Sequence, residues 1–363
     1  MKKNITLSLL LVTLLSVTGC DDENAYNGQT GLIGGGSSTV ETTENSSLES
    51  SIISLYSLIK EDSANAYINS LEMLQSLNTL QSNPNELTLR DAQTAFKKLT
   101  LSYKRVETFY VAGANDANMK DIAEFYIEQY IKQSKNYDVV ADLDAVFSSN
   151  KTIVKNDLKG LTALEYTLFG NAESLSSLNE KMDEKRLDSA LIMANNIVKR
   201  FKSIDEYYKA DTTFLSDSDA AIGTTLNVLV QQAFNLREWR IGEPAGFTLK
   251  YKDDPSTSRL EYHRSLNSLE SIKEILDTHK KIMNSGLKNI AILGNSTSEA
   301  EAILTAIDDA LALCETYPSS LVDGLANDET FELYETIRTL QNNYTALINA
   351  LNFRQDLLEA DGD

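Results

Sequence analysis

The stretch LESSIISLYSLIKEDSANAYINSLEMLQSLNTL, residues 48–80, decides the fold class. Its apolar residues recur mostly at steps of three and four, which is the spacing of one face of an α-helix: Leu48, Ile52, Leu55, Ile59, Ala66, Leu71 and Leu74. No proline or glycine interrupts the stretch, and Asn83-Pro84-Asn85 follows it. Because proline lacks the N–H that a helix needs, we expect one long helix that ends there.

The same helical pattern continues along the rest of the chain, and no convincing strand pattern appears. Thr88, three residues before Asp91, predicts a capping-box start for the next helix. Gly170 and Gly286 predict helix ends. We expect further helices over residues 88–110, 117–134, 138–147, 160–169, 180–209, 219–239, 258–285, 298–316 and 328–360. Helices of this length joined by short loops predict an all-α protein made of helical bundles.

The chain length of 363 residues fits about two domains. We expect two four-helix-bundle-like domains packed together, an N-terminal one over 48–175 and a C-terminal one over 176–363.

The amino-acid composition excludes some functions. The net charge of −20 argues against nucleic-acid binding, which requires a basic face. Two cysteines and two histidines nearly exclude a Cys/His zinc site, which usually takes four such ligands.

The first residues resemble a targeting sequence. Lys2 and Lys3 precede an apolar run, Ile5 to Val17, that is too short to span a bilayer, so residues 1–19 predict a signal peptide. The run ends in Val17-Thr18-Gly19-Cys20, which resembles a bacterial lipobox. We therefore expect Cys20 to be lipidated and to anchor the protein to a membrane, the alternative being an ordinary signal peptide with a chance cysteine.

Residues 20–47 are polar and acidic and contain no lysine or arginine, which predicts a flexible tether. The folded part would then lie in the periplasm or at the cell surface of a bacterium, with inner and outer membrane both left open. If Cys20 is lipidated, Cys314 has no cysteine partner, and its apolar neighbours predict a small buried side chain.

Two stretches differ from plain bundle sequence. In Lys159-Gly-Leu-Thr-Ala-Leu-Glu-Tyr-Thr-Leu-Phe-Gly170, Glu165 lies among apolar residues, with Thr162 on the same helical face. A buried carboxylate needs a partner, although Glu165 could also point to water. In the second stretch, residues 236–247, Arg237 and Arg240 share a face and could hold a carboxylate. Alternatively, they cap the carbonyls at a helix end.

A third stretch, residues 261–268, places Glu261, Ser265 and Ser268 on one polar stripe of the expected helix. His263 lies on another face of that helix, and we expect it at the surface. His279, beside Lys280 and Lys281, is likewise expected at the surface near a helix end.

Together these stretches resemble the imelysin-like family over residues 48–360. The family signature Gly-x-His-x-x-Glu reads here Gly160-Leu-Thr162-Ala-Leu-Glu165, followed by Tyr166. The Arg240-Ile-Gly242-Glu-Pro244-Ala-Gly246 segment resembles the family's Gly/Pro loop, and the run from Ser265 resembles its following helix.

The resemblance implies two helical domains with a ligand-binding site at their interface and a role linked to iron uptake at the bacterial envelope. The site residues so implied are Gly160, Thr162, Glu165, Tyr166, Arg237, Arg240, Gly242, Pro244, Glu261 and Ser265. Glu165 is the candidate ligand for iron or another divalent cation, weakened because Thr162 replaces the motif histidine, a better transition-metal ligand than a hydroxyl.

Three functions stay open. The first is a non-enzymatic envelope lipoprotein that binds an iron-related ligand or an iron-uptake partner protein. The second is a metallopeptidase, as some family members were described, although the chain has no His-x-x-Glu pair. The third is a structural lipoprotein whose site has decayed. We further expect Glu165 to be buried where the two halves meet, paired with Arg237 or Arg240, and with the loop between Gly242 and Gly246 close by.

The lipobox yields a direct prediction. Cys20→Ser removes the thiol that would carry the lipid, so the variant should leave the membrane fraction and lose the mass of the acyl chains. Fractionation and mass spectrometry of the wild type and the variant measure this. Identical membrane association and mass in both proteins would show that Cys20 is not an anchor.

Overall fold

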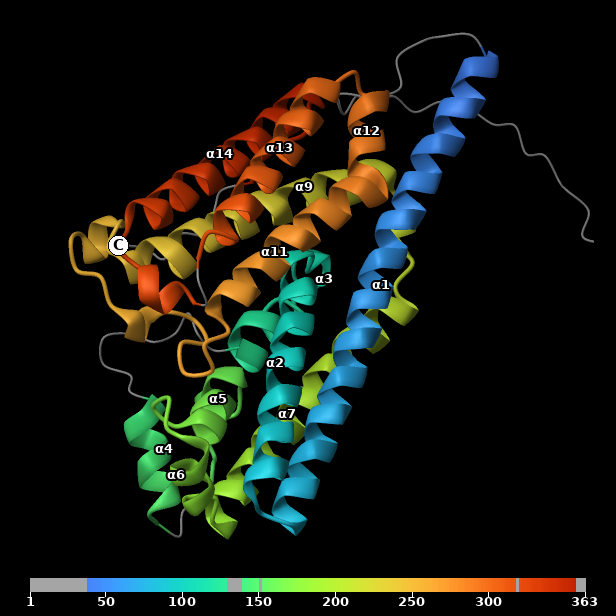
Figure 1. Ribbon diagram of the computed structural model, residues 1–363. Helices are drawn as coiled ribbons and strands as arrows, with labels where there is room; N and C mark the ends of the chain where they lie inside the picture. The colour runs from blue at the N-terminus through green and yellow to red at the C-terminus, as the bar shows by residue number, and fades with distance from the viewer. Residues whose placement is uncertain (1–37, 129–138, 150–151, 318–319, 357–363) are drawn as a thin grey trace, which may run out of the picture. The chain divides into compact units, whose positions relative to one another are not determined.

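The computed structural model describes residues 38–128, 139–149, 152–317 and 320–356. Within them every regular element is a helix, as the sequence predicts (Figure 1). The longer helices are α1 (Ser38–Ser82), α2 (Glu86–Thr108), α7 (Glu184–Ala210), α9 (Ser218–Asn235), α11 (Ser268–Ile282), α13 (Thr297–Cys314) and α14 (Asp328–Ala350).

Shorter helical pieces connect them. Short α-helices are α3 (Val111–Asn115), α4 (Val139–Phe147), α5 (Leu161–Phe169), α6 (Leu175–Glu180), α8 (Thr213–Ser216), α10 (Glu243–Ala245) and α12 (Lys288–Leu293). Wider π-helical turns form η1 (Ile122–Glu128), η3 (Leu236–Gly242) and η6 (Met283–Leu287). The remaining turns are 3₁₀-helical: η2 (Asn156–Leu158), η4 (Leu249–Tyr251), η5 (Thr257–Arg259) and η7 (Leu321–Gly324).

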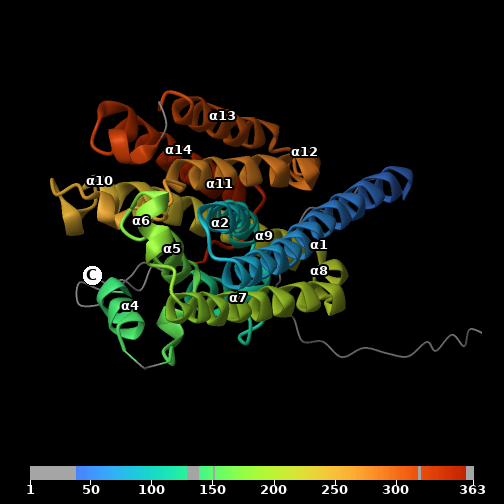
Figure 2. The same ribbon diagram turned by 60° about the horizontal axis from the view of Figure 1, so that its bottom comes forward.

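The long helices pack side by side. Helix α1 lies against α2 and α7, while α14 lies against α13 and α9 (Figures 1 and 2). Helix α11 contacts both α2 and α13, so it connects helices from the two ends of the chain. One hydrophobic core runs through these elements from Ile52 to Leu351. The predicted domain boundary at residue 175 coincides with the start of α6, and the division into two domains there stays a prediction.

Several helix starts differ from those that the sequence predicts. Helix α1 begins at Ser38 rather than Leu48, so the last part of the expected tether is helical. Extending an existing helix costs far less than starting one, because each added residue contributes a hydrogen bond. Helix α2 is capped by Asn85 rather than Thr88; the Asn85 side chain accepts from the Thr88 N–H, and the Thr88 hydroxyl accepts from the Asn85 N–H.

The prediction of one helix over 258–285 is wrong in its first third. Tyr262 and Leu266 adopt φ values of +54° and +56°, a left-handed conformation that a helix does not contain. Residues 260–267 therefore form a loop, and α11 begins at Ser268. Contacts with Glu165 and Lys104, which are distant in the sequence, hold this loop, so the local sequence pattern does not reveal it.

Other helix limits also shift. The expected 117–134 helix is a turn followed by η1, and residues 129–138 lie outside the described part of the chain. Helix α14 ends at Ala350 rather than 360. Gly170 closes α5 at φ +58°, as predicted. Gly286 does not end a helix but lies within η6, where a Cβ atom would be 2.5 Å from the Ser51 carbonyl oxygen of α1.

Two potentially reactive side chains, Cys314 and His279, are buried. Cys314 is 1% exposed, as expected, and burial raises the pKa of its thiol to about 12. The surface prediction for His279 is wrong, because its ring is fully buried and its Nδ1 lies 3.0 Å from the hydroxyl oxygen of Tyr344. Burial lowers the pKa of His279 to about 3. His263 is half-buried, with Nδ1 2.9 Å from the Leu260 carbonyl oxygen.

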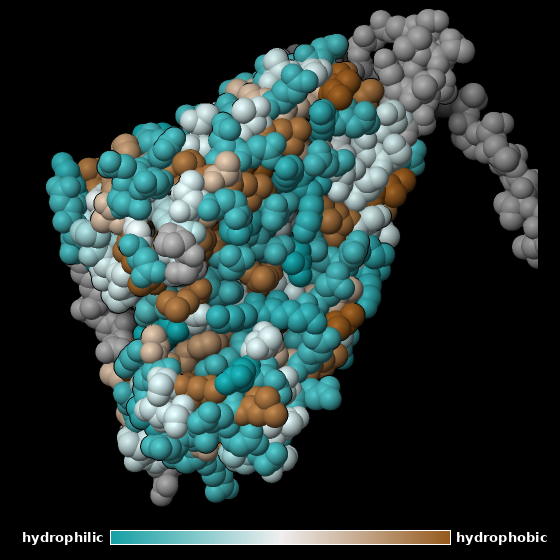
Figure 3. Space-filling view, in the orientation of Figure 1, coloured by the Kyte–Doolittle hydropathy of each residue, from teal (hydrophilic) through white to brown (hydrophobic). Residues whose placement is uncertain are grey.

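On the face seen in Figure 3, apolar residues lie scattered among polar ones. No helix in the described ranges is long and apolar enough to cross a membrane. The lipidation prediction for Cys20 falls on a residue outside the described part of the chain.

The close approach of α1 and η6 gives a stability prediction. Gly286→Ala would push a Cβ atom against backbone of α1, and such overpacking typically costs about 1–3 kcal/mol. Gly223→Ala in α9 is the matched control, because its Cβ would meet only the Phe353 ring at 3.4 Å and alanine favours a helix. Urea unfolding of both variants measures the difference, and equal stability would contradict the tight contact.

Candidate functional site

Five charged side chains meet inside the molecule, and we call them the ion cluster. Lys104 and Glu107 come from α2, Glu128 ends η1, Arg240 comes from η3, and Glu261 lies in the loop before α11. Their side chains are between 0% and 4% exposed. Segments that are distant in sequence therefore share one buried electrostatic centre.

The contacts within the ion cluster are dense. Lys104 Nζ lies 2.8 Å from Glu107 Oε2, 2.8 Å from Glu128 Oε1, and in direct contact with Glu261 Oε1. The Arg240 guanidinium lies 2.5 Å from Glu107 Oε1 and 3.0 Å from Glu261 Oε2. A charge-assisted hydrogen bond is stronger than a neutral one, so these contacts offset much of the cost of burying the charges.

Local structure aims these side chains inward. Lys104 and Glu107 are three residues apart on α2 and so share one face of the helix. Arg240 lies in the π-helical turn η3, next to the fully buried Ile241. A π-helical turn inserts an extra residue into the helix, which rotates the following side chains relative to a regular α-helix. Such turns are frequent at functional sites.

The cluster holds unequal charge, since two cations face three carboxylates. Burial alone would raise the pKa of Glu107, but Arg240 and Lys104 lower it to about 2. Glu128 behaves differently: burial raises its pKa, and Glu107 adds to the effect, while Lys104 opposes it. Burial and the neighbouring Arg240 lower the pKa of Lys104, which its glutamate partners counteract.

Helix α5 carries the two signature positions, and both contact this region. The Thr162 hydroxyl donates to the Glu128 carbonyl oxygen at 2.8 Å. Glu165 is 1% exposed, and its Oε1 accepts from the Ser265 N–H at 2.9 Å and from the Ser265 hydroxyl at 2.7 Å. Arg264 lies 3.9 Å from Glu165 Oε2. Burial raises the pKa of Glu165, and the Ser265 hydrogen bonds lower it.

The structure confirms that Glu165 is buried but gives it different partners from those predicted. Glu165 binds Ser265 and Arg264, while Arg240 binds glutamates of the ion cluster. The loop over 260–267 explains this outcome, because its turn exposes the Ser265 N–H, which a continuous helix would have used internally.

The other predicted site residues divide into two groups. Gly160 precedes the first residue of α5, and the Tyr166 hydroxyl donates to Asp144 at 2.6 Å, so both lie near Glu165. The second group packs on α14: Arg237 pairs with Glu238 and lies over the Tyr334 ring, and a Cβ on Gly242 would be 2.8 Å from that ring. The Pro244 carbonyl oxygen accepts from the Ser256 N–H at 2.8 Å, which fixes the loop that follows α10.

A family model named peptidase M75, imelysin, matches residues 62–352. The chain belongs to the imelysin family. Two solved structures share its fold. An imelysin-like protein from Psychrobacter arcticum 273-4 has a TM-score of 0.70 at 18% identity, covering 86% of this chain and 98% of that one.

The second solved structure is described as a "putative iron-regulated protein A precursor" from Parabacteroides distasonis ATCC 8503. It has a TM-score of 0.66 at 13% identity, covering 84% of this chain and 95% of that one. At these identities the likeness shows the imelysin fold. No curated protein is similar enough in sequence to match the chain.

The family model is named a peptidase, so we ask whether the residues around the signature positions could bind a metal ion. Glu165 Oε1 already accepts two hydrogen bonds, and the Thr162 hydroxyl donates to a carbonyl. The carboxylates of the ion cluster surround two cationic side chains, which would repel a metal ion. Among the described residues, no group of His, Cys, Asp or Glu is arranged to hold one. With Lys104 and Arg240 bound to these carboxylates, the residues do not fit a metal ion.

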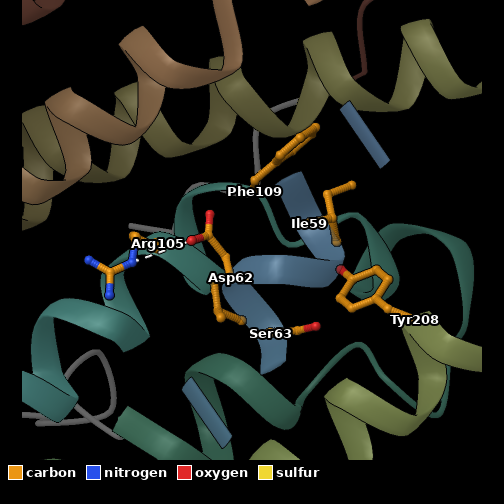
Figure 4. A pocket seen from close by; sticks show the side chains of 7 residues that line it. Ile59, Asp62, Ser63, Arg105, Phe109 and Tyr208 are labelled. Carbon is orange, nitrogen blue, oxygen red and sulfur yellow. Dashed lines mark ion pairs between the residues drawn. The ribbon is translucent and has the colours of Figure 1, made fainter. Parts of the chain in front are cut away.

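A second place of interest is the crevice between α1 and α2 in Figure 4, which Asp62, Arg105, Phe109 and Tyr208 help to line. Arg105 Nε lies 3.4 Å from Asp62 Oδ1, and burial still raises the pKa of Asp62 to about 6. The crevice is too narrow to hold even a water molecule, so it offers no room for a ligand.

Sequence reasoning missed Lys104, Glu107 and Glu128. One signal was present: Glu107 lies four residues after Tyr103 and eight after Leu99, on the apolar stripe of its helix. An acid at a core position indicates a buried partner. Nothing local identified that partner, because Arg240 is more than a hundred residues away in the chain.

The pKa of Glu107 is lowered and that of Glu128 is raised, which predicts that replacing the two residues destabilises the fold to different extents. Glu107 has a folded pKa of about 2 against an ordinary 4.5, so its charge stabilises the fold above pH 4.5, and this contribution disappears as the pH falls toward 2. Glu107→Gln should therefore cost about 3 kcal/mol at pH 7, and progressively less below pH 4.5.

Glu128→Gln is the matched control in the same cluster. Because burial already disfavours the charged form of Glu128, this variant should cost less than Glu107→Gln at pH 7. Denaturant unfolding of both variants at pH 7 and pH 4 measures the difference. An equal loss at pH 7 would contradict the assignment of the charges.

Proposed function

We propose that this imelysin-family protein is a non-enzymatic, lipid-anchored protein of the bacterial envelope that binds an iron-related ligand or partner in iron uptake. The arrangement of Glu165 carries the proposal. Its carboxylate is buried and holds Ser265 from the neighbouring loop, so it is unsuited to activate a water molecule or to ligate a catalytic metal. A hydrolytic zinc site needs three protein ligands and an open position.

The link to iron and to the envelope has separate support. A protein with the same fold is described as an iron-regulated protein A precursor, and the term precursor agrees with the signal peptide and lipidated Cys20 that the sequence predicts here. The proposal places the folded part in the periplasm or at the cell surface, held by the lipid.

The loop over 260–267 is the proposed contact surface of this site. Leu266 is 50% exposed in this loop, and half-buried His263 and Arg264 precede it. The loop carries two residues in a left-handed conformation, Tyr262 and Leu266. Backbone strain of this kind gathers at binding sites, where surrounding contacts hold it in place. Glu165 supplies such a contact through Ser265.

Growth under iron limitation tests the proposal. Deleting the gene should slow growth when an iron chelator is present but not in iron-rich medium, and the wild-type gene should restore growth. Leu266→Asp should fail to restore it, because a charge replaces the exposed apolar side chain of the loop. Leu249→Asp is the matched control, since Leu249 is 92% exposed elsewhere and should tolerate the charge.

Two outcomes would contradict the proposal. Chelator-sensitive proteolysis by the purified protein, abolished by Glu165→Gln, would establish the metallopeptidase instead. Normal growth of the deletion strain under iron limitation would favour a structural envelope protein.

A further inference from the structure

The Lys104 side chain has the environment of a bound metal ion. Its Nζ contacts carboxylate oxygens of Glu107, Glu128 and Glu261, which come from α2, η1 and the loop before α11. The side chain is 0% exposed. A surface lysine would exchange such partners with water, but here the protein supplies all three contacts.

Carboxylate oxygens are also the ligands that hard divalent cations prefer. A further oxygen lies at the edge of the same group. Tyr262 is 2% exposed, its ring lies 5.3 Å from Lys104 Nζ, and its hydroxyl has no hydrogen-bond partner in the described part of the chain. Burial raises the pKa of this hydroxyl most, and Glu128 and Glu107 raise it further, so the hydroxyl lies in their electrostatic field.

We propose that Lys104 is the built-in cation of a carboxylate site, where its ammonium group fills the position that a divalent metal ion would otherwise occupy. The geometry and the charge both fit this role. The five side chains of the ion cluster carry a formal charge of −1, and without the Lys104 ammonium they would carry −2. A buried negative charge of that size needs a positive counter-charge.

A covalently attached cation has a consequence for the protein. The ion cluster connects α2, η1, η3 and the loop before α11, so these segments stay joined whatever the supply of metal around the protein. A metal ion in the same place would be lost at low concentration, and the junction would weaken with it. This inference concerns the ion cluster alone and does not depend on the proposed role in iron uptake.

Replacing the ammonium in the mature full-length protein tests the inference. Lys104→Ala removes the charge and leaves space, so the variant should melt at a lower temperature than the wild type. Millimolar Mn²⁺ or ethylammonium should then raise its melting temperature by about 5 °C. Neither cation should shift the wild type, in which Lys104 fills the position.

Lys104→Met is the matched control, because methionine removes the charge while its side chain fills much of the space. It should be destabilised, and neither cation should raise its melting temperature. Equal stabilisation of both variants would overturn the inference, since it would show binding elsewhere. A Lys104→Ala protein as stable as the wild type without added cation would also overturn it.

A second variant covers the case in which Lys104→Ala does not fold at all. Lys104→Met combined with Glu128→Gln removes one charge of each sign and restores the formal charge of −1. This double variant should melt above Lys104→Met alone. A melting temperature equal to or below that of the single variant would overturn the role of Lys104 as the counter-charge.

Discussion

The burial of one ammonium group among three carboxylates is the constraint on which the centre of this protein depends. Lys104 and Arg240 lie on elements that are far apart in the chain, and each contacts glutamates from other elements. Such an arrangement adds little net stability compared with apolar packing, but removing one partner leaves an uncompensated buried charge. The cluster therefore disfavours any packing in which α2, η1, η3 and the 260–267 loop do not meet.

The irregular elements of the fold are where this constraint acts. Glu128 closes one π-helical turn and Arg240 lies in another, while Glu261 belongs to a loop that interrupts an otherwise helical pattern. A regular α-helix satisfies its own backbone, whereas the Glu128 carbonyl at the end of η1 and the 260–267 loop also bind side chains from elsewhere. Ser265 illustrates this dependence, because its N–H donates to the Glu165 carboxylate instead of to a carbonyl of its own segment.

The position of Glu165 changes how a signature residue is interpreted. In the imelysin family the motif would suggest a metal-binding pair, yet here Thr162 and Glu165 both bind neighbouring segments of the protein. The acid that the sequence indicates as a candidate metal ligand acts as a hydrogen-bond acceptor that positions a loop. Similarity of fold to other imelysin-like proteins agrees with either role, so the contacts of each residue have to decide between them.

The sequence by itself determined the fold class, most long helices, the Gly170 helix end and the burial of Cys314, because apolar spacing and local capping are short-range properties. It also indicated that Glu165 needs a partner, since a carboxylate among leucines is costly to bury. The tertiary structure alone decided that this partner is Ser265, that Arg240 binds Glu107 and Glu261, and that Lys104 lies between three glutamates. Those contacts join residues up to about 160 positions apart, and no local pattern encodes which distant charges will meet, because electrostatic pairing depends on distances that exist only after the helices have packed.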